Sequence, residues 1–446
     1  MLGWPSLGKG SRLRIFLDIS RLVIGAWRSM PTGIDRVELA YARHWVKQDP
    51  ERVTFILRSP FDTACAVPHA LVAEFVLALE MRRLGAPGWE DAAKPAARLA
   101  REAMLRLALG RGTLDLARAL KTPEQSVYLL VSHTLADRPR PIAAIKRKGV
   151  KFTPLVHDLI PLAYPEYTSP AGARRHLRRI ETFAGLADGI IVNSEATADD
   201  LAPQLLRGAQ QLPRLCAPLG LDTPIPDPHY PVPTGAYFVC IGTIEPRKNH
   251  LLLLNTWRVL AERLGIEAPK LLLIGRRGWE NENILDMLDR CPALVGLVRE
   301  YNGLPDKAVA SLLQGARALL FPSFTEGYGL PLAEALALGV PAICSDLPAL
   351  REVGGDVPEF LDPLDGLGWR RLILNYAEPD SRMREAQLER MGFWTQPSWE
   401  KHFAMVEPWL RQIAYAGQAK KAPRNPAEAV NGVAEARIPA PVAQVP

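Results

Sequence analysis

The stretch Glu326-GYGLPLA-Glu334 joins an apolar run of strand length, residues 318–324, to a segment with the pattern of a helix, residues 331–339. The helical segment has proline in its first turn and glycine at its end, which is typical of helix boundaries. The stretch therefore predicts a buried strand, a tight turn and a helix, with one carboxylate at the turn and a second one in the helix.

The predicted turn has the features of a phosphate site. Gly327 and Gly329 let the backbone turn tightly and approach a ligand closely. The free N–H groups and the positive dipole end of the following helix suit a phosphate. The two carboxylates can accept hydrogen bonds from sugar hydroxyls, and phosphate together with hydroxyls indicates a nucleotide sugar. The alternative is an ordinary strand–helix unit whose glutamates are solvated.

A second stretch, Gly242-TIEPRKN-Asn249, leaves a predicted strand at residues 237–241 and enters a helix that Asn249 can cap. Arg247 and Lys248 are therefore expected at a strand end, just before a helix. Fixed cations at such a place stabilise the charge that develops on a departing diphosphate more than they stabilise the ground state. The alternative is a solvated basic turn.

The composition excludes several classes of function. With 446 residues, 48% hydrophobic and 23% charged, the chain has the size and composition of a globular protein of two or three domains. Its net charge of +6 is compatible with anionic ligands or an anionic membrane face, and it is too weak to indicate nucleic acid. The 5 cysteines lack metal-ligand spacing, and no signal peptide or apolar run of membrane length is recognised. We therefore expect a cytoplasmic location.

Strands and helices alternate in both halves of the chain, which predicts parallel sheets covered by helices. The expected strands are residues 13–19, 53–57, 127–131, 152–156, 189–193, 237–241, 270–274, 318–321 and 341–344. The expected helices are residues 35–46 (capped by Asp35), 171–187, 195–207, 249–264, 281–290, 306–316 and 331–338.

The predicted fold class is therefore α/β, with two doubly wound domains that face each other across a cleft, where open parallel sheets bind their ligands. The proposed boundaries are an N-terminal domain at 1–222 with a helical basic insertion at 84–121, a proline-rich linker at 223–235, a C-terminal domain at 236–395, a closing helix at 396–416 and a disordered tail at 417–446.

The insertion has two interpretations. Its helical stretch, residues 94–112, places four arginines among alanines and leucines. It is either a membrane-surface helix on the acceptor side or a helix packed on its own domain with arginines reaching into solvent.

The segments at 242–249 and 321–346 closely resemble the retaining glycosyltransferases of family 4, which have the GT-B fold. Further matching segments follow in the expected order, at residues 32–37, 156–161, 191–197, 218–222 and 274–282. The resemblance covers about residues 12–412. It is nearest to bacterial mannosyltransferase-like members that build exopolysaccharide or O-antigen repeat units.

The resemblance assigns roles in the donor site. Glu326 would contact the hydroxyls of the donor hexose, Glu334 the ribose hydroxyls, and Lys248 with Arg247 the diphosphate. The backbone of Gly327, Tyr328, Gly329 and Leu330 would also touch the phosphates. Lys248, Glu326 and His157 are the predicted catalytic residues.

The N-terminal domain would complete that site. Gly33 would lie under the diphosphate, His157 would face the donor sugar with its ring oriented by Asp158, and Ser194 would lie near His157. Asp18 has a weaker claim to line the cleft. Many relatives carry arginine where this chain has Thr243, so the diphosphate is expected to depend more on Arg247 and Lys248.

The implied reaction is transfer of a hexose, with retention of configuration, from GDP-mannose or another nucleotide diphosphate sugar to a polyprenyl-diphosphate-linked saccharide at the inner membrane face. The leaving phosphate would take the acceptor proton, and no metal ion or cofactor is expected because cations replace a divalent ion. Two alternatives remain open: a nucleotide-sugar 2-epimerase of the same architecture, and a non-catalytic protein that binds sugar nucleotides or polysaccharide.

Overall fold

The computed structural model describes residues 13–28, 31–84, 89–122, 125–205, 212–223 and 225–416, and the side chains of residues 89–93 are not described. The described residues up to Ala414 form one compact unit. The predicted tail at 417–446 lies outside the described residues.

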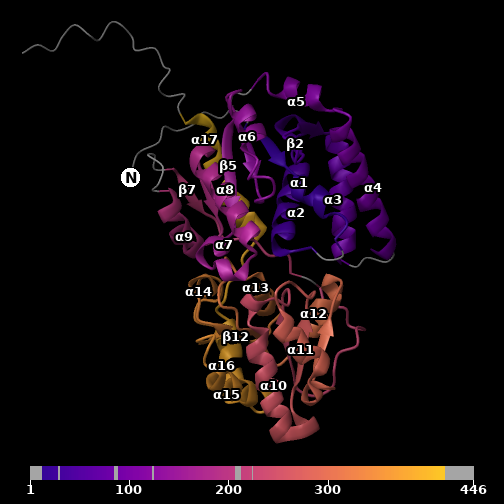
Figure 1. The fold of residues 1–446 in the computed structure, drawn as a ribbon, viewed down its shortest axis with the longest axis vertical. Helices are drawn as coiled ribbons and strands as arrows, with labels where there is room; N and C mark the ends of the chain where they lie inside the picture. Colours follow the sequence, from indigo (N-terminus) through magenta and orange to yellow (C-terminus); the bar gives the residue numbers. More distant parts are fainter. Residues whose placement is uncertain are drawn as a thin grey trace, which may run out of the picture. The chain divides into compact units, whose positions relative to one another are not determined.

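The first sheet has seven strands in the order β3–β2–β1–β4–β5–β6–β7. Figure 1 shows strands β2, β5 and β7 of this sheet. All neighbouring strands are parallel except β2 and β3. The strands are β1 Arg14–Asp18, β2 Val53–Arg58, β3 Ala64–Val67, β4 Ser126–Leu130, β5 Lys151–Val156, β6 Ile190–Val192 and β7 Arg214–Cys216. We call this sheet and the helices packed on it the first lobe.

The second sheet has six parallel strands in the order β10–β9–β8–β11–β12–β13. The strands are β8 Tyr237–Ile241, β9 Lys270–Ile274, β10 Val298–Tyr301, β11 Leu319–Phe321, β12 Ala342–Ser345 and β13 Glu359–Leu361. This sheet and its helices form the second lobe. The predicted pair of doubly wound sheets is confirmed.

The helices follow the strands, as parallel connections require. In the first lobe they are α1 Ser20–Gly25, α2 Gly33–Val46, α3 His69–Leu84, α4 Trp89–Ala108, α5 Thr113–Ala119, α6 Pro139–Lys146, α7 Ile160–Ala163, α8 Pro170–Leu186 and α9 Glu195–Leu205. In the second lobe they are α10 His250–Leu264, α11 Glu282–Arg290, α12 Asp306–Gln314, α13 Leu330–Ala337, α14 Pro348–Gly354, α15 Gly366–Ala377 and α16 Arg382–Met391, and the chain continues to α17 Trp399–Tyr415.

Two predicted helix caps are wrong. Thr32, not Asp35, caps α2, because Thr32 Oγ1 accepts the Asp35 N–H at 3.4 Å while Asp35 Oδ2 accepts the Thr32 N–H at 2.7 Å. This is a reciprocal capping box, so the helix begins two residues earlier than expected. Asn249 precedes α10 in the left-handed conformation (φ 56°), and its side chain donates to the Pro363 carbonyl at 2.8 Å instead of capping the helix.

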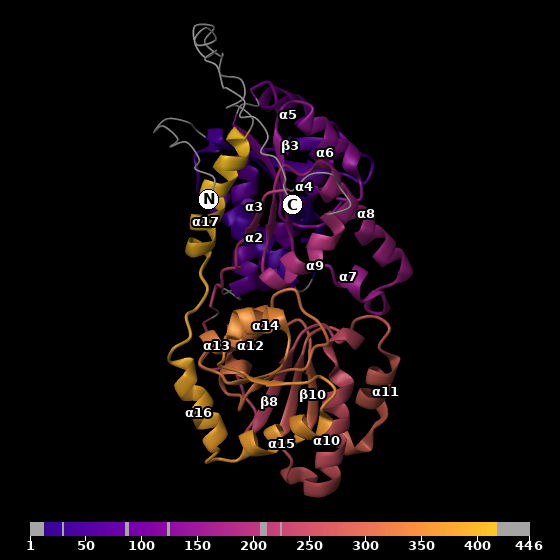
Figure 2. The ribbon, with the colours of Figure 1, turned by 90° about the vertical axis from the view of Figure 1, so that its left-hand side faces the viewer.

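The predicted closing helix, α17, packs on the first lobe although α16 before it belongs to the second (Figures 1 and 2). His402 makes hydrogen bonds to the Tyr41 hydroxyl at 2.7 Å and to the Pro218 carbonyl at 2.9 Å. Only glycine fits at position 220, since a Cβ atom there would lie 2.2 Å from the Trp399 nitrogen. The chain therefore crosses between the lobes twice.

Asp18 does not line an open cleft, because it is buried in an ion pair inside the first lobe. Its Oδ2 accepts hydrogen bonds at 2.5 Å from Arg58 Nε and from the Tyr128 hydroxyl. Arg58 is fixed further by the carbonyls of Thr134 and Leu135, at 2.8 and 3.0 Å. The pair ties β1 to β2 and to the loop after β4.

We predict that Arg58→Met lowers the free energy of unfolding by about 3 kcal/mol, because it leaves the Asp18 carboxylate buried without its cation. Urea unfolding followed by circular dichroism measures the change. The matched control is Arg258→Met on α10, whose pair with Glu262 spans 3.5 Å between side chains that are 57% and 60% exposed, and we expect it to change stability by less than about 1 kcal/mol. An equal change in the two variants would contradict the structural role of the buried pair.

Candidate active site

Lys248 and Glu326 meet at the carboxyl ends of two neighbouring strands. Lys248 ends a short 3-10 turn, Pro246–Lys248, that follows β8, and Glu326 lies in the turn between β11 and α13. Because β8 and β11 are adjacent and parallel, the two turns leave the same edge of the sheet. Lys248 Nζ donates a hydrogen bond to Glu326 Oε1 and lies 5.0 Å from the centre of the Phe321 ring.

Arg247 fastens the same two turns together. Its Nη1 lies 3.1 Å from Glu326 Oε1 and donates to the Thr325 carbonyl at 2.7 Å, and its Nη2 donates to Glu245 Oε1 at 2.8 Å. The Arg247 carbonyl accepts the Phe324 N–H at 2.9 Å. Two cations therefore share one carboxylate in a cluster whose side chains are at most 17% exposed.

The cluster controls the charge of its members. Burial alone would raise the pKa of Glu326, but Lys248 and Arg247 outweigh it and lower the pKa to about 2. Burial and the charge of Arg247 lower the pKa of Lys248, and Glu326 opposes that shift. The site thus holds two cations, each paired with a carboxylate, so it offers positive charges to the anionic part of a ligand and carboxylate oxygens to its hydroxyls.

The glycine-rich turn after Glu326 packs directly against the first lobe. The Gly327 carbonyl accepts hydrogen bonds from Ser194 Oγ at 2.9 Å and Thr197 Oγ1 at 3.2 Å. A Cβ atom at Gly327 would lie 2.3 Å from the His157 carbonyl oxygen, so only glycine permits this approach. Tyr328 donates its hydroxyl hydrogen to the Leu219 carbonyl at 2.8 Å.

Gly329 has φ 108° and precedes the first residue of α13, Leu330. A Cβ atom at Gly33, at the start of α2, would lie 3.4 Å from Leu330 Cδ1. The structure therefore brings Gly33, His157 and Ser194 of the first lobe to the turn at 327–330. These are the residues that the sequence assigned to the donor site from the first half of the chain.

The sequence predicts that Asp158 orients the His157 ring, and this prediction is wrong. A backbone carbonyl orients the ring instead. The ring Nε2 lies 2.7 Å from the Val131 oxygen, and because a carbonyl only accepts, Nε2 carries the hydrogen. Asp158 Oδ1 instead accepts the Ile160 N–H at 3.1 Å and so begins the turn into α7. Burial lowers the pKa of His157 to about 4, so the ring is neutral near pH 7 with Nδ1 as its free acceptor position.

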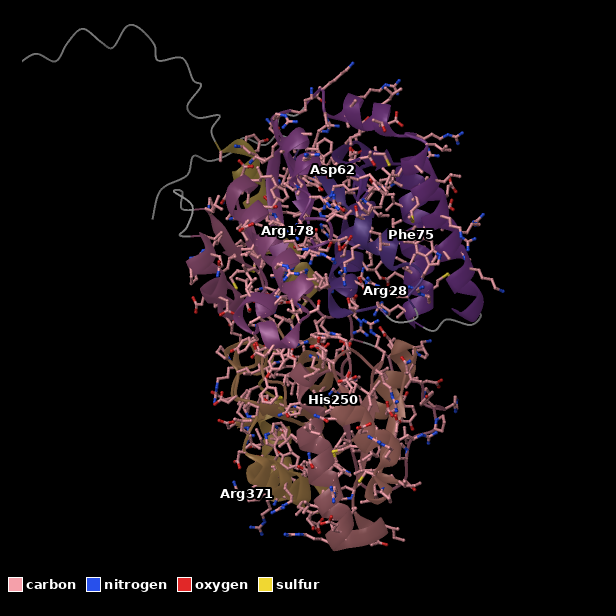
Figure 3. All side chains as sticks on the ribbon, in the orientation of Figure 1. Arg28, Asp62, Phe75, Arg178, His250 and Arg371 are labelled. Carbon is pink, nitrogen blue, oxygen red and sulfur yellow. The ribbon has the colours of Figure 1, made fainter. Side chains whose placement is uncertain are left out.

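Glu334 is buried on α13 and paired with an arginine that the sequence did not single out. Arg36 of α2 donates from Nη1 to Glu334 Oε1 and from Nη2 to Asp306 Oδ1, the latter at 2.8 Å. Arg36 lies inside the matching segment at 32–37, yet neither periodicity nor spacing indicates that its side chain reaches the other lobe. Figure 3 shows Arg28 of the same region at the end of the first lobe that adjoins the second.

A pocket opens beside Arg36, between the lobes. Its apolar walls include Leu22, Leu39 and Leu79 of the first lobe and Leu304 and Pro305 of the second. A smaller pocket next to it is lined by Leu330, Glu334 and Trp399. Space for part of a ligand thus adjoins both Glu334 and the turn at 327–330.

Within the part of the chain that the structure describes, no group of three or more His, Cys, Asp or Glu side chains is arranged to hold a metal ion. None of the helices formed by the described residues has both the length and the apolar character needed to cross a membrane.

The class of fold follows from solved structures. HepE from Anabaena, solved in complex with UDP-glucose, superimposes with a TM-score of 0.55 at 12% identity, over 92% of this chain and 100% of that chain. At this identity the likeness concerns the fold, which is the expected GT-B arrangement of two Rossmann-like domains.

Part of the chain matches a family of known proteins. Residues 226–357 match the family model described as glycosyl transferases group 1, which identifies a group 1 glycosyltransferase domain in this part of the chain. It is 33% identical over 221 residues to the O-antigen chain mannosyltransferase B of Escherichia coli, and 27% identical over 243 residues to the serotype-specific mannosyltransferase WbdA of Escherichia coli. Each match covers 50% of this chain, and 54% and 29% of the relative, respectively. The resemblance to mannosyltransferases is confirmed over that length.

Acid stability offers a test of the cluster. Glu326 has a pKa of about 2 in the folded protein against an ordinary value of 4.5, so between these pH values the unfolded chain binds more protons. We therefore expect the stability advantage of the wild type over Glu326→Gln to be complete above about pH 5 and to shrink by about 1.4 kcal/mol per pH unit below pH 4.5.

Urea unfolding between pH 6 and pH 3 measures that advantage. The control, Glu262→Gln, removes an exposed carboxylate of α10, and its difference from the wild type should stay flat over this range. A flat difference for Glu326→Gln as well would mean that the carboxylate is not held by Lys248 and Arg247.

Proposed function

We propose that this protein is a retaining glycosyltransferase that transfers mannose from a nucleotide diphosphate sugar to a saccharide acceptor in O-antigen or exopolysaccharide synthesis. The observation that carries the proposal is the cluster of Lys248, Arg247 and Glu326 at the start of the glycine-rich turn, closed off by the first lobe. The group 1 domain and the Escherichia coli relatives named as mannosyltransferases support the choice of reaction and sugar.

The donor is bound through opposite charges and hydroxyls. Lys248 and Arg247 neutralise the diphosphate, and the free N–H groups at the start of α13, from Tyr328 to Leu330, face its oxygens. Glu326 accepts hydrogen bonds from hydroxyls of the hexose, and Glu334 from those of the ribose. Gly33 and Ser194 line the donor site from the first lobe, and His157 contacts the sugar through Nδ1, since its Nε2 is bonded to Val131.

The proposed reaction needs no nucleophile from the protein. The bond between the anomeric carbon and the diphosphate oxygen breaks, and the acceptor oxygen forms its bond to that carbon on the same face. The acceptor hydroxyl proton passes to the departing phosphate oxygen. The fixed cations stabilise the charge on the leaving group, which is greater in the transition state than in the bound donor. The proposal includes no metal ion and no cofactor.

We predict that Lys248→Met lowers kcat by about 10²- to 10³-fold, because it removes a preorganised charge from the leaving group. Glu326→Ala should abolish measurable transfer. The assay follows release of nucleoside diphosphate with GDP-, UDP-, ADP- and dTDP-sugars, with and without a polyprenyl-diphosphate-linked saccharide, and Glu262→Ala serves as the control.

The outcomes separate the candidate functions. Release of nucleoside diphosphate that depends on the acceptor and requires Lys248 would support a glycosyltransferase. Release of a free sugar or epimer from UDP-N-acetylglucosamine without acceptor would favour the 2-epimerase, and binding without turnover would favour a non-catalytic sugar-nucleotide protein. Wild-type turnover in either active-site variant would contradict the assigned roles.

The acceptor is proposed to reach the site from an anionic membrane surface. One face of α4 packs into the first lobe through Ala96, Leu99, Ala100 and Ala103, which are buried. The opposite face exposes Leu105 (56%), and Leu109 (57%) lies one turn further along, just after the helix ends at Ala108. Two exposed arginines precede them at helical spacing, Arg98 and Arg101, and Leu114 of α5 is 70% exposed. Apolar and basic side chains on one face are typical of an interfacial helix.

We predict that the double variant Leu105→Glu, Leu109→Glu lowers partition onto vesicles of phosphatidylglycerol and phosphatidylethanolamine by at least about tenfold, since it removes apolar area and adds like charge to the contact. Vesicle sedimentation measures the partition. The control places Glu at Ile266 and Phe393, each 90% exposed in the second lobe, and should bind as the wild type does. Equal partition of both double variants would leave α4 as a helix packed only on its own lobe.

A further inference from the structure

Arg36 joins the two lobes at the carboxylate assigned to the ribose. It lies on α2 of the first lobe, while both of its acceptors belong to the second: Glu334 on α13 and Asp306 at the start of α12. Arg83 of α3 donates to the other oxygen of the same aspartate, Asp306 Oδ2, at 3.1 Å. The guanidinium of Arg36 is thus fixed by two carboxylates, and one of these is held in turn by a second arginine.

This contact is not an ordinary surface ion pair. The side chains of Glu334 and Asp306 are each 8% exposed, and that of Arg36 is 27% exposed. A buried carboxylate without a partner is costly and tends to take up a proton instead. Burial raises the pKa of Glu334, and the positive charge of Arg36 is the largest influence that opposes it.

The contact also leaves acceptor capacity on Glu334. Arg36 donates to Oε1, and the described residues make no hydrogen bond to Oε2. An ionised carboxylate can accept about four hydrogen bonds over its two oxygens. A ribose can therefore be bound while the arginine stays in place.

We propose that Arg36 is a positioning residue for nucleotide recognition: from the first lobe it orients Glu334 and keeps it as a carboxylate, and so completes the ribose subsite only when the lobes are together. This inference rests on the proposed function, because it takes the ligand to be a nucleoside diphosphate. Arg36 itself acts through Glu334. Asp306 and Arg83 set the direction of its guanidinium.

The test measures how strongly the protein prefers a nucleotide with ribose hydroxyls to one without them. Isothermal titration calorimetry measures the Kd of GDP and UDP, and of their 2′,3′-dideoxy counterparts, for the wild type, Arg36→Gln and Arg36→Lys. We expect the wild type to favour the ribonucleotide by at least about tenfold and Arg36→Gln to lose most of this preference. Arg36→Lys should recover part of it. Binding of the dideoxy nucleotides should change by less than about twofold, which also shows that the variant is folded.

Glu352→Gln is the matched control, because Glu352 also joins the lobes but has no contact with Glu334. Its Oε2 and Oε1 accept the backbone N–H groups of Glu195 and Ala196 at the start of α9, at 2.7 and 2.8 Å. This variant should keep the full preference for the ribonucleotide. Loss of the preference here as well would mean that any contact between the lobes suffices, and would overturn the specific role of Arg36.

A pH series provides a second readout. The charged groups that face Glu334 are Arg36 of α2, Arg83 of α3 and Asp306 of α12, and Arg83 also contacts Glu80 and Asp222, at 3.3 and 3.8 Å. Removing the charge of Arg36 raises the pKa of Glu334 further. Ribonucleotide affinity should therefore begin to fall at a higher pH in Arg36→Gln than in the wild type as the pH is lowered.

The outcomes separate this inference from the proposed function. A wild type that binds none of the nucleotides would overturn the proposed function. A wild type that binds GDP or UDP without preference for the hydroxyls, an Arg36→Gln variant that keeps the preference, or an equal loss of both nucleotide types would each overturn the role of Arg36 while leaving the enzyme class intact.

Discussion

The site depends on the Glu326 carboxylate, which pairs with two cations away from water while Glu245 also pairs with Arg247. Lys248, Arg247 and Glu326 would each be costly to bury alone, and together they compensate one another. Their side chains come from turns 78 residues apart in the chain, so the ion pairs also fix where the turn after β8 lies against the turn after β11. An anionic ligand entering this edge meets charges that are already oriented, which is the condition for strong electrostatic stabilisation.

The contact between the lobes depends on the same turn. Gly327 has no side chain, and this lets its carbonyl reach Ser194 and Thr197 while its Cα lies against the His157 backbone. On one side of this contact, Glu352 accepts hydrogen bonds from the first turn of α9. On the other, Arg36 reaches Glu334 and Asp306. Residues from both halves of the sequence therefore meet around the turn that follows Glu326.

Much of the fold was predictable because buried parallel strands are continuous apolar runs, and all nine expected strands are present within two residues of their predicted bounds. The strands that were missed, β3, β7, β10 and β13, are the four edge strands of the two sheets. They are three or four residues long and carry mixed or ambiguous patterns. Lys248, Glu326 and the glycines after Glu326 were recognisable from the sequence. Ligands of open parallel sheets bind at strand ends, and glycines let the backbone approach a ligand closely. Arg36 and the carbonyl that orients His157 were not, since each depends on a tertiary contact that leaves no local pattern. The cap at Thr32 does have a local signal, a threonine three residues before Asp35, which the prediction overlooked.

The two crossings of the chain between the lobes are bonded to each other. The Leu221 N–H donates to the Pro397 carbonyl at 3.2 Å, the Gln396 side chain donates to Thr223 Oγ1 at 2.6 Å, and Gly220 lies against Trp399. The two connections therefore lie against each other on one side of the lobes. A rotation of the second lobe about this paired connection would separate Arg36 from Glu334 and Ser194 from Gly327 in one movement.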